Sequence, residues 1–462
     1  MSAQQKMKKG DARCPGAPST QEIIASDKVK APFWVTCESY EFLGDEDVTK
    51  DRYIDPDFQK KEFERLWPRT WQFACREEHI PEVGDYHVYD IGPYSFIVTR
   101  VAKNEIRAYY NACLHRGTKL RASGTEGNTS EFKCSFHGWS WNLDGTNKEI
   151  LCQWDFPHVD RAKLNLPQAR VETLGGFVFI NMDPAAPSLE EYIGPEAMAH
   201  IKAWKLEDRY VALHVVKTIP SNWKLNIEAF MEAYHVLDTH PQVSVSNADA
   251  NSQYDTFGEH VNRFISTLGV LSPHHYGKYT EQDIFDQFTI GDPEALGDSK
   301  PKLPEGVTAR QAMADMFRTM YEKANNADLG GVSDAELLDC FSYTLFPNLF
   351  LFPGISLPMV YRFRPHPKDH RKSIYEVFFL RPVPKDGARP YPAEPIRLRE
   401  DQSFTEAEGM PAGFGNILDQ DTDNLILQQE GLEASAKRGL TLANYQEIRI
   451  RHFQHAIDKY VR

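Results

Sequence analysis

Two short runs of metal-binding side chains constrain this chain more than any other feature of its sequence. Cys113 and His115 form a Cys-x-His run, and Cys134 and His137 form a Cys-x-x-His run. Each run ends in a glycine within two residues of its histidine, and glycine tolerates the backbone angles that a tight ligand loop needs. Eighteen residues separate His115 from Cys134. We therefore expect two facing loops, each with one thiolate and one imidazole.

This donor set favours a two-iron, two-sulfide cluster in which both cysteines bind one iron and both histidines bind the other, the Rieske arrangement. Neutral imidazoles in place of two thiolates remove negative charge from one iron, so such a cluster is easier to reduce. A structural zinc site is the alternative. Zinc pairs usually read C-x(2–4)-C and H-x(3–5)-H, whereas each pair here holds one cysteine and one histidine, so the Rieske interpretation is favoured.

Length and composition indicate a large soluble protein. A chain of 462 residues is too long for one ordinary core, which predicts two domains. Charged residues make up 26% and hydrophobic residues 41%, as in globular proteins. The net charge of −14 argues against nucleic acid as a partner, because phosphate binding needs a basic face.

The cysteines and the absence of long apolar runs predict a cytoplasmic location. Apart from the two metal-binding runs, the seven cysteines are scattered singly and odd in number, which suits a reducing compartment. The N-terminal residues are polar and lack the apolar core of a secretory signal. No window approaches 18 apolar residues, so we expect no membrane span.

The order of apolar patterns divides the chain. Short alternating runs between 84 and 180 predict a small β-domain over 51–185, with the metal loops at its tip. Residues 186–462 predict a larger second domain, and residues 1–50 a polar arm packed on it. Within the second domain we expect a helix over 309–324, strands over 341–352, 359–363 and 374–380, and C-terminal helices from Leu418 and from Tyr445.

A second candidate metal site lies in the stretch 222–240, which lacks internal Gly and Pro and is predicted to be helical. On a helix, Glu228, Glu232 and His235 would share one face. His240 stands directly before a proline, where the helix must loosen. Two histidines and one carboxylate commonly bind mononuclear non-haem Fe(II), which makes His235 and His240 candidate ligands. Glu232 is placed to orient His235 through a hydrogen bond.

The runs Phe-Lys-Cys-Ser-Phe-His-Gly-Trp-Ser-Trp at 132–141 and Tyr-Asn-Ala-Cys-Leu-His-Arg-Gly at 110–117 resemble the large (alpha) subunit of Rieske non-haem iron aromatic-ring-hydroxylating oxygenases. The stretch 222–235 is similar to the catalytic helix of that family. The resemblance implies an α+β fold, with a small all-β Rieske [2Fe-2S] domain and a larger antiparallel-sheet catalytic domain of the helix-grip (START-like) type.

The resemblance also implies ligands and an electron route. The catalytic iron would be held by His235, His240 and a carboxylate of the C-terminal acidic run, where Asp421 matches the ligand position. Asp419 and Asp423 are alternatives, although a helix points them elsewhere. An acidic helix N-terminus would also explain this run.

Glu232 would bridge His235 to a cluster histidine of the neighbouring subunit. Many ring dioxygenases carry Asp at this position, and the Glu here resembles branches that include quaternary-ammonium mono-oxygenases. Ala229, however, stands where that branch often has Asn.

The implied function is that of the oxygenase component of a multicomponent system. It would use O₂ and electrons from a separate ferredoxin, NAD(P)H reductase, or both to mono- or dioxygenate an apolar, aromatic substrate. The resemblance implies a homotrimer, with or without small β-subunits. No Gly-rich dinucleotide fingerprint is present, so the reductase would be another chain.

Three alternatives remain open. The first is a mono-oxygenase or demethylase for aliphatic or quaternary-ammonium substrates. The second is a Rieske electron carrier without oxygenase activity, and the third is a scaffold with structural metals. Apolar residues of 225–360 are candidates for a substrate pocket, namely Phe230, Leu345, Phe350 and Phe352.

Overall fold

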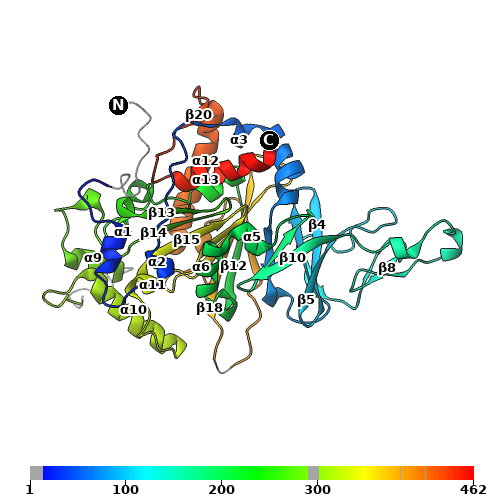
Figure 1. The fold of residues 1–462 in the computed structure, drawn as a ribbon, viewed down its shortest axis with the longest axis horizontal. Coiled ribbons are helices and arrows are strands. Elements are labelled where there is room, and N and C mark those ends of the chain that lie inside the picture. Colours follow the sequence, from blue (N-terminus) through cyan, green and yellow to red (C-terminus); the bar gives the residue numbers. More distant parts are fainter. Residues whose placement is uncertain (1–13, 290–300, 386, 412) are drawn as a thin grey trace.

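A β-rich small part and a larger mixed part lie at opposite ends of the elongated molecule in the computed structural model (Figure 1). The structure describes residues 14–289, 301–385, 387–411 and 413–462. The first thirteen residues of the predicted arm lie outside this description. Within the described ranges, no helix has both the length and the apolar character that a membrane span requires.

The small part contains an antiparallel sheet in the order β2-β11-β10-β5-β4-β3-β6 and a separate hairpin sheet β7-β8-β9. Its strands are β2 (Gln72–Arg76), β3 (Asp85–Ile91), β4 (Tyr94–Ala102), β5 (Glu105–Tyr110), β6 (Glu126–Asn128), β7 (Glu131–Lys133), β8 (Ser140–Asn142), β9 (Asn147–Glu149), β10 (Gln168–Leu174) and β11 (Phe177–Asn181). The predicted β character of this segment is confirmed. The Cys134/His137 run joins β7 to β8 of the hairpin sheet, and the Cys113/His115 run lies between β5 and β6 of the larger sheet. Figure 1 shows β8 on the far side of the small part.

The larger part is built on a sheet in the order β13-β14-β15-β16-β17-β18-β12-β19, antiparallel except where β12 pairs with β19. Its strands are β12 (Arg209–Ile219), β13 (Gln253–Phe257), β14 (Val261–Ser266), β15 (Cys340–Leu345), β16 (Leu349–Phe352), β17 (Met359–Pro365), β18 (Ser373–Pro382) and β19 (Pro395–Leu398). Most residues of the central strands are buried, as expected for a sheet covered on both faces. The predicted α+β fold class is confirmed by this arrangement and by the solved structures described below.

Helices cover this sheet and frame the candidate site. They are α1 (Thr20–Ala25), α2 (Phe33–Thr36), α3 (Asp51–Ile54), α4 (Pro56–Lys61), α5 (Leu189–Ile193), α6 (Pro195–Ala203), α7 (Trp223–Glu228), α8 (Val236–Thr239), α9 (Glu281–Thr289), α10 (Ala309–Asn325), α11 (Asp334–Leu338), α12 (Phe414–Ala434) and α13 (Ile448–Val461). The helix predicted over 309–324 is confirmed as α10. Helix α7 packs on β17 and β18, α13 packs on β13 and β14, and α12 packs on α7.

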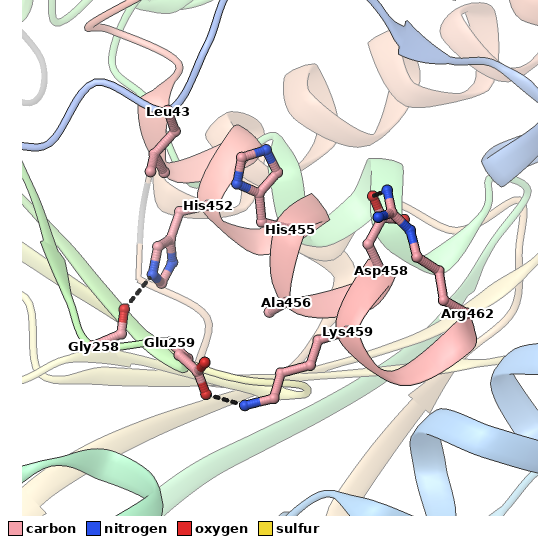
Figure 2. Close-up of a pocket in the computed structure, with 9 residues that line it drawn as sticks. All are labelled: Leu43, Gly258, Glu259, His452, His455, Ala456, Asp458, Lys459 and Arg462. Carbon is pink, nitrogen blue, oxygen red and sulfur yellow. Dashed lines mark hydrogen bonds and ion pairs between the residues drawn. The ribbon is translucent and has the colours of Figure 1, made fainter.

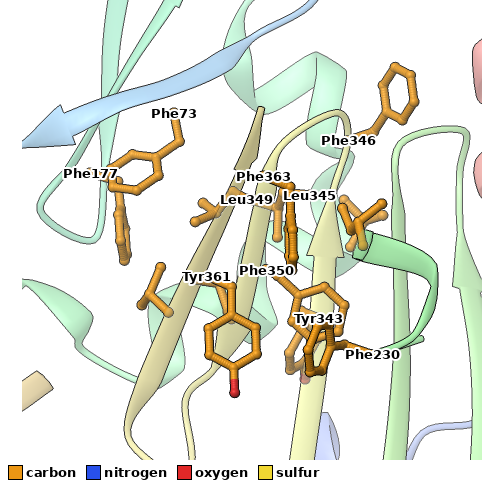
Figure 3. Packing of buried hydrophobic residues seen from close by; sticks show 14 of the residues in the cluster. Phe73, Phe177, Phe230, Tyr343, Leu345, Phe346, Leu349, Phe350, Tyr361 and Phe363 are labelled. Carbon is orange, nitrogen blue, oxygen red and sulfur yellow. The ribbon is translucent and has the colours of Figure 1, made fainter. Parts of the chain in front are cut away.

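An aromatic cluster fixes the segment between α7 and α8 to the sheet. The Phe230 ring lies 5.0 Å from Tyr361 and 5.8 Å from Phe363, centroid to centroid. Figure 3 shows these rings with Phe350 over the strands. Phe363 also stacks on Tyr375 at 4.9 Å. Burial of such rings is a large part of core stability, so this cluster holds the segment after α7 against the sheet.

The predicted helix over 222–240 is wrong in its middle, because residues 229–235 are irregular between α7 and α8. Tertiary partners replace the helical hydrogen bonds there. Arg449 donates to the Met231 carbonyl at 3.1 Å, and the Ala233 amide donates to the Tyr254 hydroxyl at 3.0 Å. Since these backbone groups are satisfied from outside, the helix can open without leaving buried polar atoms unpaired. The predicted shared helical face of Glu228, Glu232 and His235 therefore does not form.

The C-terminal acidic run lies inside a helix rather than at its start. Helix α12 begins at Phe414, after Gly413 in the left-handed region (φ 76°), four residues before the predicted start at Leu418. Asp421 is buried within α12, beyond the first turn where the helix dipole acts on side chains. An acidic helix N-terminus does not explain Asp421.

The described part of the N-terminal arm lies against the larger part. Strand β1 (Val48–Thr49) pairs with β20 (Gly439–Leu440). The Thr20 hydroxyl donates to the Asn251 carbonyl at 2.7 Å, and the Ser39 amide donates to the Asp255 carboxylate at 2.6 Å. Residues 14–50 are therefore anchored at several points.

Candidate metal centres

His235, His240 and Asp421 come together although Asp421 lies 181 positions after His240 in the sequence. One donor atom from each lies within 4.8 Å of the others. His240 Nε2 is 2.9 Å from Asp421 Oδ1, and His235 Nε2 is 3.6 Å from the same oxygen. His240 and Asp421 are buried, and the His235 side chain is one quarter exposed. Two imidazoles and one carboxylate in this arrangement fit a mononuclear Fe(II) ion with open positions.

The competing aspartates are occupied elsewhere or point to solvent. Asp419 accepts a hydrogen bond from the Phe404 amide at 2.9 Å and a short one from the Ser403 hydroxyl. Asp423 is exposed. Among these three aspartates, only Asp421 lies beside the two histidines.

Each histidine of the trio has a partner on its other ring nitrogen. Glu232 Oε1 lies 2.8 Å from His235 Nδ1, and Gln420 Oε1 lies 2.9 Å from His240 Nδ1. With Nδ1–H donated to these oxygens, Nε2 of each ring, the nitrogen that lies nearer Asp421, is the atom left to bind a metal ion. The role of Gln420 was missed in the sequence, where its only signal was its place next to Asp421.

Two cavities that differ in polarity adjoin the trio. The apolar cavity, of about 140 Å³, is lined by Phe230, Glu232, Ala233, His235, Val236, His240, Asn247, Phe264, Ser266, Cys340, Phe352, Leu357, Met359, Tyr361, Phe414, Ile417, Leu418 and Asp421. Of the predicted pocket residues, Phe230 and Phe352 line it, whereas Leu345 and Phe350 lie in the core (Figure 3).

The polar cavity, of about 380 Å³, lies on the other side of Glu232 and His235. Its lining includes the carboxylates of Glu228 and Glu447. Burial raises the pKa of Glu228 to about 8, although hydrogen bonds from Gln454 and Tyr53 oppose this shift. Glu232 and His235 therefore touch an apolar space on one side and an acidic one on the other.

The two metal-binding runs of the small part form matching turns. The Gly117 amide donates to the Cys113 carbonyl at 2.9 Å, and the Gly138 amide donates to the Cys134 carbonyl at 3.1 Å. Both glycines have left-handed backbone angles, with φ of 81° and 72°. The two turns thus have the same hydrogen bonding, as the mirrored spacing predicted.

The donor chemistry of these turns fits a cluster with two thiolate and two imidazole ligands. The His115 and His137 rings lie 4.7 Å apart, centroid to centroid, and Trp139 stacks on His115 at 4.8 Å. Burial raises the pKa of the Cys134 thiol, but the Phe136 and His137 amides point at its sulfur and bring the net pKa below its ordinary value. Amide donors to sulfur favour the thiolate that a metal needs.

Exposed apolar side chains surround these turns. Phe136 is 61% exposed and its ring lies 4.0 Å from that of His137, centroid to centroid, and Trp154, further along the same part of the chain, is 80% exposed. Figure 1 shows β8, which follows the Cys134/His137 turn, on the far side of the small part from α12, which lies over the larger part and carries Asp421. The two groups of candidate ligands are therefore far apart within one chain.

A larger groove on α13 carries none of the predicted site residues. It has a volume of about 630 Å³ and is lined by Leu43, Gly258, Glu259, His452, His455, Ala456, Asp458, Lys459 and Arg462. Figure 2 shows that Lys459 pairs with Glu259 and that His452 contacts the Gly258 carbonyl. Lys459 pairs with Glu259 and Arg462 pairs with Asp458, so most of the charged groups in this groove are neutralised by one another.

Iron loading through His235 is expected to depend steeply on pH. Burial lowers the pKa of His235, but the carboxylates of Glu232 and Asp421 outweigh burial and raise it to about 9. Below this pKa the ring is an imidazolium, and iron must displace its proton. Apparent Fe(II) affinity of chelator-treated protein should thus fall by up to about tenfold per unit as pH drops from about 9 to 6.

Anaerobic Fe(II) titrations across this pH range measure the slope. The Glu232→Gln variant removes the main charge that raises the pKa of His235, so its slope should flatten above about pH 7. If Fe(II) affinity depended on pH equally in both proteins, Glu232 would not be the main cause of the raised pKa of His235.

Two family models match the sequence. The model for the ring hydroxylating alpha subunit (catalytic domain) matches residues 195–462, and the model for the Rieske [2Fe-2S] domain matches residues 70–159. Together they span both groups of candidate ligands.

Curated relatives include dioxygenases and a mono-oxygenase. The sequence is 32% identical over 200 residues to the anthranilate 1,2-dioxygenase large subunit of Acinetobacter baylyi, covering 42% of each chain. It is 28% identical over 351 residues to the biphenyl 2,3-dioxygenase alpha subunit of Rhodococcus jostii, covering 71% of this chain and 68% of that protein. It is 30% identical over 195 residues to the carnitine monooxygenase oxygenase subunit of Escherichia coli K12, covering 42% and 52%. The match to the first of these spans less than half of that protein.

Solved structures share the fold. A quaternary ammonium Rieske monooxygenase superposes with a TM-score of 0.63 at 17% identity, covering 90% of this chain and 95% of that one. Naphthalene 1,2-dioxygenase from Rhodococcus sp. with bound indole superposes with a TM-score of 0.57 at 22% identity, covering 89% and 93%. At these identities the likeness concerns the fold, which both oxygenases share with this chain.

Proposed function

Because this chain belongs to the ring-hydroxylating oxygenase alpha-subunit family and contains a Rieske domain, we propose that it is the oxygenase component of a multicomponent system that inserts O₂-derived oxygen into an apolar aromatic substrate. A Rieske [2Fe-2S] cluster and a mononuclear iron are the cofactors of this family. Electrons would come from a separate ferredoxin or NAD(P)H reductase, and the system would operate in the cytoplasm.

One observation carries the proposal. His235, His240 and Asp421 converge beside a largely apolar cavity, so a metal ion there would face a guest held among apolar side chains. A pure electron carrier needs no such cavity, and a scaffold needs no open metal positions. The placement of these three residues therefore favours an oxygenase over the other classes.

In this proposal the trio holds the iron, which when bound supplies the activation of O₂. Glu232 and Gln420 keep the Nδ1 protons of His235 and His240, so that each Nε2 remains a lone-pair donor. The apolar lining excludes water from the reacting atoms and orients the substrate by shape.

The tip of the small domain would hold the cluster through Cys113, Cys134, His115 and His137. Trp139, which stacks on His115, shields that ring from water. The amides that point at Cys134 favour its thiolate. The exposed Phe136 and Trp154 beside these turns provide an apolar surface for docking.

The two groups of candidate ligands are far apart within one chain, which favours electron transfer between subunits. The solved quaternary ammonium monooxygenase is described as informative on inter-subunit electron transfer. Here the cluster tip of one protomer would dock on the polar cavity of the next, where Glu232 would link His235 to a cluster histidine. A homotrimer closes such head-to-tail contacts into a ring, with or without small β-subunits.

The size and lining of the apolar cavity limit the range of substrates that would fit. An apolar cavity of about 150 Å³ suffices for benzene, and the cavity here has a volume of about 140 Å³. Its lining contains no lysine or arginine to pair with a carboxylate such as that of carnitine. A neutral one-ring aromatic compound fits better than a zwitterionic quaternary ammonium compound, which remains the second candidate because of the mono-oxygenase relatives.

A product-mass assay tests this function. The iron-loaded protein with a surrogate reductase and ¹⁸O₂ is given one-ring aromatic, two-ring aromatic and quaternary ammonium compounds. We expect ¹⁸O in a product of the one-ring compounds, with a mass gain that separates one inserted atom from two. Turnover confined to the quaternary ammonium compounds would favour the second candidate, and uncoupled or absent turnover with all of them would contradict the proposal.

Enlarging the cavity is expected to shift preference toward two-ring substrates. Met359 lines the cavity, is buried and lies at the start of β17. Met359→Ala removes three heavy atoms from the wall, and the ratio of kcat/KM for two-ring over one-ring compounds should rise by about tenfold or more. The cost in folding stability is about 2–5 kcal/mol. Met316→Ala, at an exposed position on α10, is the matched control and should leave the ratio unchanged.

A further inference from the structure

A separate group of metal-binding side chains lies where the N-terminal arm crosses α6. Cys37 directly follows α2, and Glu196 and His200 stand four residues apart on α6. One donor atom from each lies within 4.8 Å of the others. We call these residues the Cys37–Glu196–His200 cluster. It shares no residue with either candidate centre described above.

The distances in this cluster suit a tetrahedral ion. Cys37 Sγ lies 3.4 Å from His200 Nε2. A zinc ion bonded to one thiolate and one imidazole at its usual bond lengths holds these atoms about 3.6 Å apart. Glu196 and His200 share one face of α6 because residues four apart on a helix are neighbours. The fold therefore brings together a sulfur, a nitrogen and a carboxylate oxygen, which are the donor types that zinc binds.

The position of Cys37 is fixed before any ion binds. Its carbonyl accepts hydrogen bonds from Arg263 at 2.9 Å and from Gln253 at 2.8 Å. The Arg263 guanidinium is itself paired with the buried Asp255 at 2.6 Å, so it does not present an uncompensated positive charge. Arg263 Nη2 also lies 3.5 Å from Cys37 Sγ, where it can donate to a metal-bound thiolate.

His200 and Glu196 each present an atom that can bind a metal. His200 is completely buried, and its Nε2, which lies 3.4 Å from Cys37 Sγ, is the ring nitrogen that would bind the ion. Burial lowers the pKa of His200 to about 4, so the ring is neutral and able to bind a metal at neutral pH. Glu196 is exposed and forms no ion pair in the described part of the chain, which leaves its carboxylate available.

We propose that the Cys37–Glu196–His200 cluster binds one Zn²⁺, with water as the fourth ligand. On binding, the Cys37 thiol releases its proton to solvent and its sulfur bonds to the metal. The ion joins the arm to α6 and so fixes residues 33–39 against the catalytic domain. This site is independent of the proposed oxygenase function, because it requires neither the cluster nor the catalytic iron.

Zinc binding is tested on the holoprotein with its iron and its cluster in place. The protein is incubated with about one equivalent of Zn²⁺ and desalted, and metals are counted by mass spectrometry. Zinc K-edge absorption then identifies the ligands. We expect close to one zinc per chain with one sulfur neighbour at about 2.3 Å. Competition with a chromogenic chelator gives the affinity.

Two variants and one control separate this site from the others. Glu196→Gln, at an exposed position, should lower zinc affinity by at least about tenfold, and Cys37→Ser should remove the sulfur neighbour. Cys152→Ser changes an exposed cysteine outside the cluster and should retain the zinc. Glu196→Gln carries the test if Cys37→Ser fails to fold. Absence of zinc, a spectrum without one sulfur neighbour, or equal affinity in Glu196→Gln would overturn the proposal.

Discussion

Replacing Asp421 by alanine is expected to remove the catalytic iron and at least about 10³-fold of the oxygenase activity while leaving the Rieske centre intact. Asp421 Oδ1 lies within 2.9 Å of His240 Nε2 and 3.6 Å of His235 Nε2, so its loss leaves two neutral ligands and no charge to balance the cation. Iron should fall from about three atoms per chain to about two. The EPR signal of the reduced cluster should not change.

Asp423→Ala is the matched control for this experiment. Asp423 lies two residues further along α12 and is exposed, so its replacement should retain iron and activity. If both variants kept three irons, or if only Asp423→Ala lost one, Asp421 would not be the third ligand. Iron analysis, EPR and product formation are measured on the same samples.

Replacing Glu232 by glutamine is expected to slow turnover by about 10²-fold or more with iron retained. The glutamine side-chain oxygen can still accept the Nδ1 proton of His235, which preserves the ligand orientation seen at 2.8 Å. The negative charge that favours electron arrival at His235 is lost, so the defect should appear in electron transfer. Rapid mixing of pre-reduced protein with O₂ and substrate measures cluster oxidation directly.

Mixed trimers test whether electrons pass from the cluster of one subunit to the iron site of its neighbour. Chains with Cys113→Ser and chains with Asp421→Ala should each be inactive alone. Co-assembled at equal amounts, about a quarter of the contacts would join an intact cluster to an intact iron site on the neighbouring protomer, and activity should reappear. Inactive mixed trimers would place the route within one chain and remove the proposed role of Glu232. Asp238→Asn, at an exposed position three residues after His235, serves as the control for charge removal near the site.

The sequence predicted well those features that depend on a few consecutive residues. The two turns around Cys113 and Cys134 follow from glycines within two positions of the histidines, because local backbone angles are set by local residues. The short strands of the small part, the strand runs over 341–352, 359–363 and 374–380, and helix α10 were recognisable from local apolar patterns, whereas β12, β13, β14 and β19 were not predicted.

Features that depend on distant partners were predicted poorly. The stretch around Glu232 has the composition of a helix, yet Arg449 and Tyr254 open it from positions far along the chain. Gln420 became part of the site only through the approach of α12 to His240. Local propensity is a small free energy per residue, and tertiary contacts overrode it here.

By itself, the sequence determined the ligand types of both candidate centres and the order of the two domains, because donor atoms and periodicity are properties of short segments. The family resemblance favoured Asp421 over Asp419, and the tertiary structure brings Asp421 to the histidines beside a small apolar pocket whose size no local pattern gave. The tertiary structure also decided that the two groups of candidate ligands lie far apart within one chain. These outcomes depend on how helices pack on the sheet, and packing joins residues that no local pattern connects.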